Sequence, residues 1–332
     1  MKKMINNSEG IVDEMLKGIV MAHPEYLKRV KGFNVLIREN SPVKGKVALV
    51  SGGGSGHEPS HGGYVGKGML DGAVAGEVFT SPTPDQVFEA IKAVDGGNGV
   101  LLVIKNYSGD VMNFEMADEM ADMEGIKVEK VIVNDDVAVE NSTYTTGRRG
   151  VAGTVFVHKI AGAAAEEGRD LEEVKRIAQK VIDHTRTMGM SLGPCIVPDA
   201  GKPSFELEED EIEMGLGIHG EPGTHRTKIS SADEVTNYMI DKILEDMPVK
   251  PNEEVAVMVN GLGGTPLMEL YIVNRKLNEL LNEKEVKVAK TFVGNYMTSI
   301  EMPGFSITVL KLDEELKRLL NAVADTPAFK QL

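Results

Sequence analysis

The chain has 332 residues, enough for one large or two medium-sized domains. Its net charge of −15 disfavours nucleic acids and anionic membrane surfaces as partners, because an acidic surface repels phosphate groups. No apolar run approaches the roughly 20 residues that span a bilayer. The first residues are not followed by the apolar stretch of a secretory signal peptide. Cys195 is the only cysteine. These features predict a cytoplasmic protein without an intrachain disulfide.

Short apolar, β-branched runs alternate with helical patterns along the first half of the chain, which is typical of an α/β fold. Continuous apolar runs predict central strands at 47–50, 100–104 and 128–133. Threonine, proline and glutamine at 83, 84 and 86 predict the start of a helix. A helical, alanine-rich pattern from Gly153 to about Gly189, broken near 168–170, places a domain boundary close to Gly189.

The second half repeats the same kind of alternation. Apolar residues at every second position from Ile212 to Ile218 predict a strand. A capping box at 231–234 and the pair Thr265-Pro266 predict two helix starts, and further strands are predicted at 255–259, 286–292 and 305–310. The predicted fold is therefore two α/β domains, residues 1–188 and 189–332, each with a mainly parallel or mixed sheet flanked by helices.

The densest motif is Ser-Gly-Gly-Gly-Ser-Gly-His-Glu-Pro at 51–59, directly after the first predicted strand. Chain segments at the carboxyl ends of parallel strands often build sites, and glycines let the backbone approach a ligand closely. The segment fits neither G-x-G-x-x-G nor the P-loop pattern. It therefore predicts a loop for a small ligand, with His57 either as an acid or base at its rim or as a structural turn residue.

Two other motifs carry reactive side chains. Asp110 follows the strand at 100–104 and could be a helix-capping or first-turn carboxylate, or a general base beside His57. His219 lies between glycines at 217 and 220, either in a surface turn or as a nucleophile that adds to a carbonyl. A zinc site at His57 and His61 is disfavoured, because Pro59 would interrupt the helix that such a motif requires.

The motifs occur together and in order, at 51–59, 76–84, 104–110, 134–139, 147–150 and 217–223. In this combination the chain resembles the dihydroxyacetone-binding K subunits of bacterial dihydroxyacetone kinases. Segments 260–266 and 304–308 extend the resemblance through the second half. It implies two α/β domains and a homodimer.

The resemblance also implies a role for each motif. His219 matches the histidine that bonds to the substrate carbonyl carbon as a hemiaminal, and His57 and Asp110 match the neighbouring acid–base pair. We expect Asp110 to take the proton of the terminal hydroxyl that is phosphorylated, and His57 to deliver a proton to the carbonyl oxygen during hemiaminal formation. The two roles could be exchanged or shared. Substrate-binding positions are expected at Gly54, Ser55, Gly56 and Lys105, and no metal site is expected.

Phosphoryl transfer needs a donor and charge neutralisation, usually by Mg²⁺. In the family, chains of this length work with a separate L subunit that holds ADP and Mg²⁺, and a multiphosphoryl carrier of the phosphotransferase system rephosphorylates that nucleotide. Single-chain relatives fuse an ATP-binding L domain after the K region. Because the chain ends at Leu332, we expect the two-protein version, with no cofactor in this chain. The alternative is a dihydroxyacetone sensor that acts as coactivator of a transcription regulator.

Overall fold

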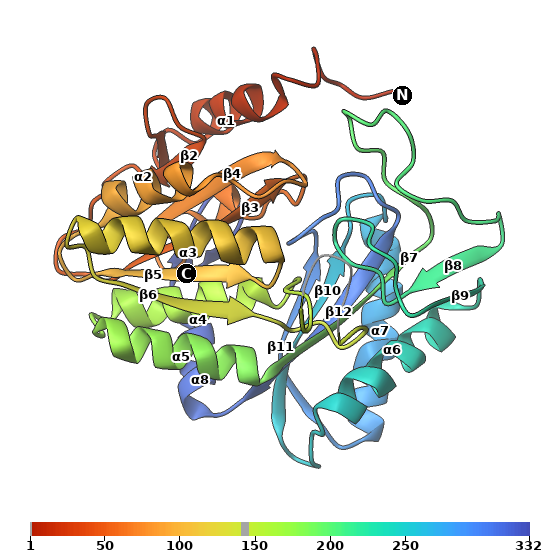
Figure 1. Ribbon diagram of the computed structural model, residues 1–332. Helices are drawn as coiled ribbons and strands as arrows, with labels where there is room; N and C mark the ends of the chain where they lie inside the picture. The colour runs from red at the N-terminus through yellow and green to blue at the C-terminus, as the bar shows by residue number, and fades with distance from the viewer. Residues whose placement is uncertain (1, 141–145) are drawn as a thin grey trace.

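The structure is a computed structural model that describes residues 2–140 and 146–332. A first mixed sheet is built by the N-terminal half of the chain (Figure 1). Its strands, in spatial order, are β1 (Leu27–Arg29), β2 (Val35–Arg38), β4 (Gly72–Val78), β3 (Ala48–Ser55), β5 (Val100–Lys105) and β6 (Val128–Val133). Strands β4, β3, β5 and β6 run parallel, whereas β2 pairs antiparallel with both β1 and β4.

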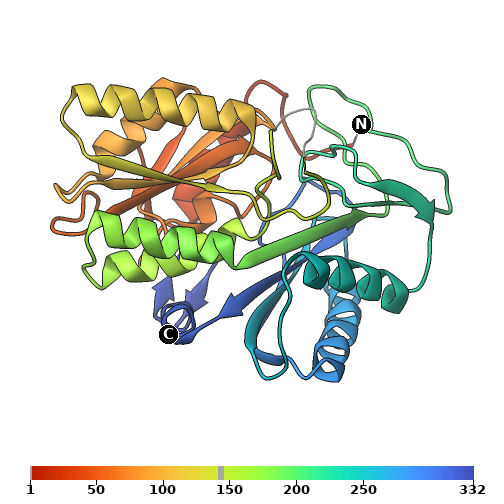
Figure 2. The same cartoon turned by 60° about the horizontal axis from the view of Figure 1, so that its bottom comes forward.

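Helices cover both faces of this sheet, as Figure 2 shows most clearly. One face carries α2 (Pro84–Val94) and α3 (Ser108–Met123), and the other carries α4 (Thr154–Glu166) and α5 (Leu171–Asp183). Every residue of β5 is buried, as expected for a central parallel strand covered on both sides. Helix α4 is buried from Thr154 to Ala165, and its small residues permit close packing, since a Cβ at Gly162 would lie 2.5 Å from the Met69 Cα.

A second mixed sheet is built by the C-terminal half. Its strands, in spatial order, are β11 (Lys287–Gly294), β10 (Glu254–Gly261), β12 (Gly304–Leu312), β7 (Thr185–Ser191), β8 (Glu211–Met214) and β9 (His225–Lys228). Helices α6 (Ala232–Asp246) and α7 (Leu267–Glu283) pack on one face of it. The predicted fold class, two mixed sheets flanked by helices, is confirmed.

One hydrophobic cluster spans the two halves, beside others that belong to a single half. Ala256 and Met258 of β10 belong to the same buried cluster as Phe156 of α4. The cluster also contains residues of the last segments of the chain, α8 (Glu314–Leu320), β13 (Ala324–Asp325) and the turn before β14 (Lys330–Gln331). The boundary predicted between residues 188 and 189 falls inside β7, and a division of the chain at that point stays a prediction.

Three local predictions need correction. The glycine-rich segment at 51–55 is strand and not loop, because Gly52, Gly53 and Gly54 continue the parallel pairing with β4. The strand predicted through Ile218 ends at Met214, where Gly215 takes a positive φ of 75°. The helical pattern predicted to reach Gly189 ends at Asp183, and β7 begins two residues later.

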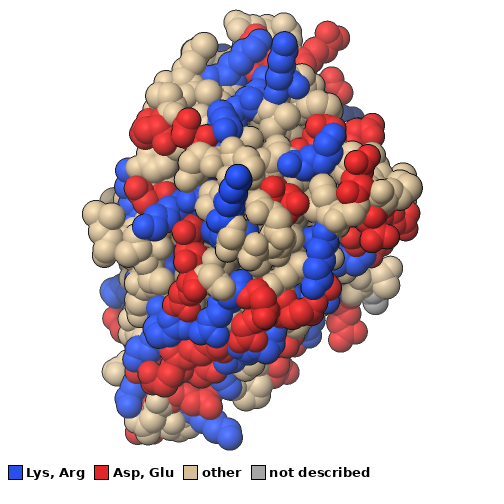
Figure 3. Space-filling model, turned by 90° about the vertical axis from the view of Figure 1, so that its left-hand side faces the viewer, with Lys and Arg blue, Asp and Glu red and all other residues tan. Residues whose placement is uncertain are grey.

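The remaining elements contact the first sheet at β1 and β4. They are α1 (Ile11–Ala22), which packs on β1 and β4, and the short 3₁₀ helix η1 (Gly62–Tyr64). Acidic and basic side chains are interspersed over the face that Figure 3 shows. Within the described ranges, no helix has the length and apolar character needed to cross a membrane.

Candidate active site

A pocket of about 700 Å³ lies where the two halves meet. Gly54 of β3 and Asp110 of α3 line it from the first half, and His219 and Glu221, from the segment after β8, line it from the second. The rings of Phe79 and Tyr107 complete an aromatic wall. The pocket therefore collects residues from four of the predicted motifs, and two of these motifs lie at the carboxyl ends of the parallel strands β3 and β5, where α/β proteins build sites.

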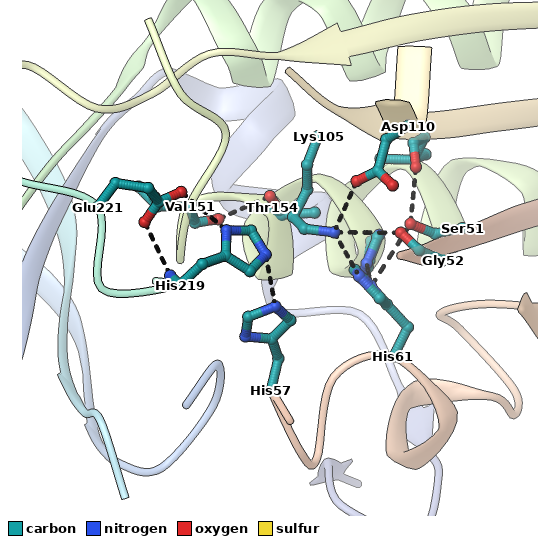
Figure 4. A network of polar contacts seen from close by, with 12 residues as sticks. Ser51, Gly52, His57, His61, Lys105, Asp110, Val151, Thr154, His219 and Glu221 are labelled. Carbon is teal, nitrogen blue, oxygen red and sulfur yellow. Dashed lines mark hydrogen bonds and ion pairs between the residues drawn. The ribbon is translucent and has the colours of Figure 1, made fainter. Parts of the chain in front are cut away.

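His219 is held from two sides. Its Nδ1 lies 2.8 Å from one oxygen of Glu221, and its backbone N–H donates to the other oxygen, also at 2.8 Å. Its Nε2 lies 3.0 Å from Nε2 of His57 (Figure 4). Nδ1 of His57 lies 2.8 Å from the backbone carbonyl oxygen of Thr298. The Tyr107 ring packs edge-on against the His219 ring at 4.6 Å between centroids.

These contacts fix the protons of the two histidines. A carboxylate and a carbonyl oxygen only accept, so both Nδ1 atoms carry a proton. The contact between the two Nε2 atoms then requires one further proton, and the pair carries a positive charge opposite Glu221. Burial, together with the nearby His219 and Lys105, lowers the pKa of His57 well below its usual range, whereas Nδ1 of His219 faces the Glu221 carboxylate.

Glu221 is the counter-ion of this pair. Burial acts to raise its pKa, but the adjacent His219 and, more weakly, Arg149 outweigh burial and bring the pKa to about 2. The carboxylate is 4% exposed and therefore stabilises positive charge on His219 with little screening by solvent. A Glu–His–His chain of this kind fixes the orientation of a nucleophilic imidazole and offers a neighbouring base.

Lys105 and Asp110 form a second group beside the first. The Lys105 ammonium is fully buried and lies 3.2 Å from the Gly52 carbonyl oxygen, 3.3 Å from Nε2 of His61 and 3.5 Å from the Asp110 carboxylate. Gly53 covers it, because a Cβ at this position, with φ of 153°, would lie 2.3 Å from Nζ. Asp110 is in the first turn of α3 and not at its cap, which is Tyr107.

The remaining predicted substrate-binding residues lie in different surroundings. Gly54 lines the pocket, whereas Ser55 donates its hydroxyl to the Gly76 carbonyl and lines a separate cavity beneath α1. The Gly56 N–H donates to the Glu58 carboxylate. His57 and His61, the residues of the zinc alternative, belong to separate hydrogen-bonded groups. The substrate roles of all these residues stay predictions.

Comparison with known proteins places the chain in a family. Residues 17–328 match the Dak1 domain. The chain belongs to the Dak1 family of dihydroxyacetone kinase proteins. A relative from Listeria innocua, the dihydroxyacetone-binding subunit DhaK of PTS-dependent dihydroxyacetone kinase 1, is 54% identical over 330 residues, which cover 99% of this chain and 100% of the relative. The resemblance inferred from the motifs is confirmed.

Two solved structures of Dak1 relatives superpose on nearly the whole chain. The dihydroxyacetone kinase of C. freundii in its native form gives a TM-score of 0.92 at 37% identity, and the match covers 99% of this chain but 60% of that chain. The dihydroxyacetone kinase operon co-activator Dha-DhaQ gives a TM-score of 0.90, also at 37% identity, with 96% of this chain and 98% of that chain covered. The fold is thus common to a kinase and to a co-activator.

Sequence reasoning missed Glu221, although its motif was identified. The residue lies two positions after His219, within the segment 217–223, and a carboxylate at that distance from a nucleophilic histidine was a usable signal. Thr298, which orients His57, carried no such signal, because its backbone carbonyl is the acceptor and any residue supplies one. The aromatic wall of Phe79 and Tyr107 was also unassigned.

The lowered pKa of Glu221 predicts a pH-dependent stability difference. Its folded pKa is about 2 and its ordinary value is 4.5, so the carboxylate stabilises the fold above pH 4.5 and this contribution is lost as the pH falls toward 2. Glu221→Gln should therefore unfold at lower denaturant than the wild type at neutral pH, and the difference should shrink at about pH 3. Urea unfolding of both proteins across this range measures it.

Glu213→Gln is the matched control, since Glu213 is also buried but pairs with the Gly223 N–H and Arg226. A Glu221→Gln deficit that stays constant from neutral pH to about pH 3 would contradict the assigned counter-ion role.

Proposed function

We propose that this protein binds dihydroxyacetone covalently, as a hemiaminal on His219, and presents it for phosphorylation to dihydroxyacetone phosphate. The observation that carries the proposal is the hydrogen-bonded chain from Glu221 through His219 to His57 at the wall of a pocket that also contains Asp110. The family of the chain and the name of its Listeria innocua relative, a dihydroxyacetone-binding subunit, support dihydroxyacetone as the substrate.

The protons carried by His219 and His57 are sufficient for hemiaminal formation. The shared proton first moves from Nε2 of His219 to Nε2 of His57, across the 3.0 Å contact. The freed Nε2 lone pair of His219 then attacks the carbonyl carbon. The π electron pair of the carbonyl moves to its oxygen, which takes the proton from His57 and becomes a hydroxyl. The product is a positively charged imidazolium adduct, and the Glu221 carboxylate, which accepts from Nδ1, stabilises that charge.

A covalent step suits a substrate of this size. Dihydroxyacetone has six heavy atoms, and only the best small ligands reach ~1.5 kcal/mol of binding free energy per heavy atom. Glycerol presents nearly the same hydroxyl groups but has no carbonyl. A bond that only a carbonyl forms rejects glycerol more strongly than hydrogen bonds would.

Asp110 is the base that we assign to the phosphorylated hydroxyl. It lines the pocket, and the Lys105 ammonium lies 3.5 Å from its carboxylate. We further propose that ADP and Mg²⁺ belong to a separate L subunit in the cytoplasm, with a phosphotransferase-system carrier as the phosphoryl source. The phrase "PTS-dependent" in the name of the Listeria innocua relative supports this donor.

One observation favours a second candidate function. The dihydroxyacetone kinase operon co-activator Dha-DhaQ shares the fold over 96% of this chain, which supports as second candidate a dihydroxyacetone sensor that acts as coactivator of a transcription regulator. A sensor needs the covalent histidine but has no use for a base at the phosphorylated hydroxyl. Because Asp110 lines the pocket, and His57 and Lys105 contact the lining residues His219 and Asp110 from behind, we favour the kinase subunit.

The proposal predicts a strict division between two proteins. Calorimetric titration of the isolated chain with Mg-ATP should give no heat of specific binding, because its sequence contains no P-loop. Mixing the chain with an L subunit, the phosphocarrier and phosphoenolpyruvate should produce dihydroxyacetone phosphate. Micromolar or tighter ATP binding would contradict the two-protein arrangement. Dihydroxyacetone binding without any product would favour the sensor.

A further inference from the structure

A second histidine pair lies behind the pocket and has no part in the chemistry described so far. His61, from the segment after β3, and His158, from α4, meet with Nδ1 of His61 3.0 Å from Nε2 of His158. Their rings pack edge to face at 5.2 Å between centroids. Both side chains are buried, and the pair reaches the active site through Lys105, whose ammonium lies 3.3 Å from Nε2 of His61 (Figure 4).

The contacts determine which nitrogen of each ring carries a proton. A lysine ammonium only donates, so Nε2 of His61 accepts and the proton of His61 is on Nδ1. The Ser51 hydroxyl, 3.4 Å from this Nδ1, already donates to the Val103 carbonyl at 2.6 Å. The Nδ1 proton of His61 is therefore directed at Nε2 of His158, and His158 keeps its own proton on Nδ1.

The hydrogen bonds from Lys105 through His61 to His158 end at the Nδ1 proton of His158, which has no acceptor among the described residues. Nδ1 of His158 is buried and has no hydrogen-bond partner among the described residues. A buried unpaired N–H costs free energy, so its presence calls for a compensating role. Burial and the nearby Lys105 lower the pKa of His61 well below its usual range and that of His158 to about 3, consistent with two neutral rings.

Lys105 depends on His61 for its position. Its three partners, the Gly52 carbonyl, His61 and Asp110, lie at 3.2, 3.3 and 3.5 Å, so that each contact is long and none alone fixes the flexible side chain. Without an acceptor at His61, one ammonium N–H would be buried and unpaired. The ammonium would then shift relative to Asp110 and to Gly53, whose backbone covers it.

We propose that His61, held in one tautomer by His158, is a positioning residue for the phosphorylation of dihydroxyacetone. It accepts a hydrogen bond from Lys105 and so keeps the ammonium beside the Asp110 carboxylate, where that carboxylate acts as base. Among the described residues, no hydrogen bond joins His61 or His158 to the His219–His57 pair, so covalent capture of the substrate does not depend on them. The inference rests on the function proposed above.

Replacing His61 with glutamine or with asparagine distinguishes its role in positioning Lys105 from a role in packing alone. Glutamine places its amide oxygen near the position of Nε2 and can accept from Lys105, whereas asparagine reaches only the position of Nδ1. His61→Asn should lower kcat of the reconstituted kinase by about 10-fold to 100-fold, the size of one hydrogen bond to a charged group. His61→Gln should restore most of that loss, and both variants should still form the His219 adduct.

A pair at position 158 tests the tautomer. His158→Gln keeps an acceptor for the Nδ1 proton of His61, whereas His158→Leu removes it and lets His61 move its proton to Nε2, toward Lys105. His158→Leu should therefore lower kcat, and His158→Gln should not. This pair stays informative if the position 61 variants fail to fold, since replacing His158 also removes the unpaired N–H.

Three measurements test these variants. Kinetics with the L subunit gives kcat, calorimetry with dihydroxyacetone gives substrate binding, and thermal unfolding shows whether each variant folds. Equal kcat for His61→Asn and His61→Gln, in proteins that fold and bind substrate normally, would overturn the positioning role. A wild-type protein that neither binds dihydroxyacetone nor yields its phosphate would instead overturn the proposed function. The two failures are thus distinguishable.

Discussion

Replacing His219 with alanine is expected to abolish covalent capture of dihydroxyacetone and to lower kcat/KM for its phosphorylation by about 10³-fold or more, the order of the loss when an enzyme is deprived of its nucleophile. The physical reason is that Nε2 of His219 is the nitrogen directed at its partner His57 while Nδ1 is held by Glu221. Alanine leaves the pocket open but offers no lone pair to the carbonyl carbon. Steady-state kinetics with the L subunit measures the loss.

His225→Ala is the matched control for this variant. His225 lies on β9 in the same half of the chain, is exposed, and packs beside Tyr238 away from the pocket residues. Its replacement should leave kcat/KM unchanged. A His219→Ala protein that phosphorylates dihydroxyacetone at a rate close to that of the control would exclude a covalent role for His219.

Replacing Asp110 with asparagine should leave the His219 adduct intact but slow phosphoryl transfer by about 10²-fold to 10⁴-fold, the usual contribution of a general base. Asparagine keeps the size of the side chain in the first turn of α3 but cannot take the hydroxyl proton. In the comparison variant His57→Asn, adduct formation itself should be impaired, because His57 delivers the proton to the carbonyl oxygen. Single-turnover kinetics and binding measurements separate the two steps.

Asp118→Asn provides the control on the same helix, since Asp118 pairs with Lys130 on the outer side of the sheet and does not line the pocket. Near-normal turnover of Asp110→Asn would be incompatible with its role as base. An Asp110→Asn protein that fails to form the adduct would indicate that Asp110 and His57 exchange their roles.

The fold class could be predicted because its signals are local. The run at 100–104 is apolar without interruption and forms a fully buried central strand, and the capping box at Ser231 forms as expected, with reciprocal hydrogen bonds to Glu234. The helix start at Thr83 was placed correctly, but the Thr83 side chain makes no cap, and Gln86 accepts instead from the Asn34 N–H on a neighbouring segment. A tertiary partner there replaces the local one.

The glycine-rich segment shows where local signals fail. Glycine at 52, 53 and 54 favours a loop by intrinsic preference. In the folded protein the same residues continue the parallel pairing with β4. They have to be glycine because neighbouring atoms leave no room for side chains. A Cβ at Gly52 would lie 2.4 Å from the Val74 carbonyl oxygen, and one at Gly54 would lie 2.6 Å from the Thr80 nitrogen. Close approach, and not flexibility, requires glycine here.

The reactive residues of the site could be found from motifs, but their connections could not. His57 is oriented by Thr298, which is 241 positions away, and His61 meets His158 at a separation of 97. Contacts at such separations depend on how the two sheets pack, which spacing along the chain does not reveal. The expected neighbour of His57 was Asp110, whereas its hydrogen bond is to His219, and Asp110 pairs with Lys105.

A crystal structure of the wild-type protein grown with dihydroxyacetone shows directly whether His219 captures the substrate covalently. We expect continuous electron density from Nε2 of His219 to a tetrahedral carbon of the ligand, with Nδ1 still donating to Glu221. A planar dihydroxyacetone molecule that lies free in the pocket, separated from the His219 ring, would contradict it.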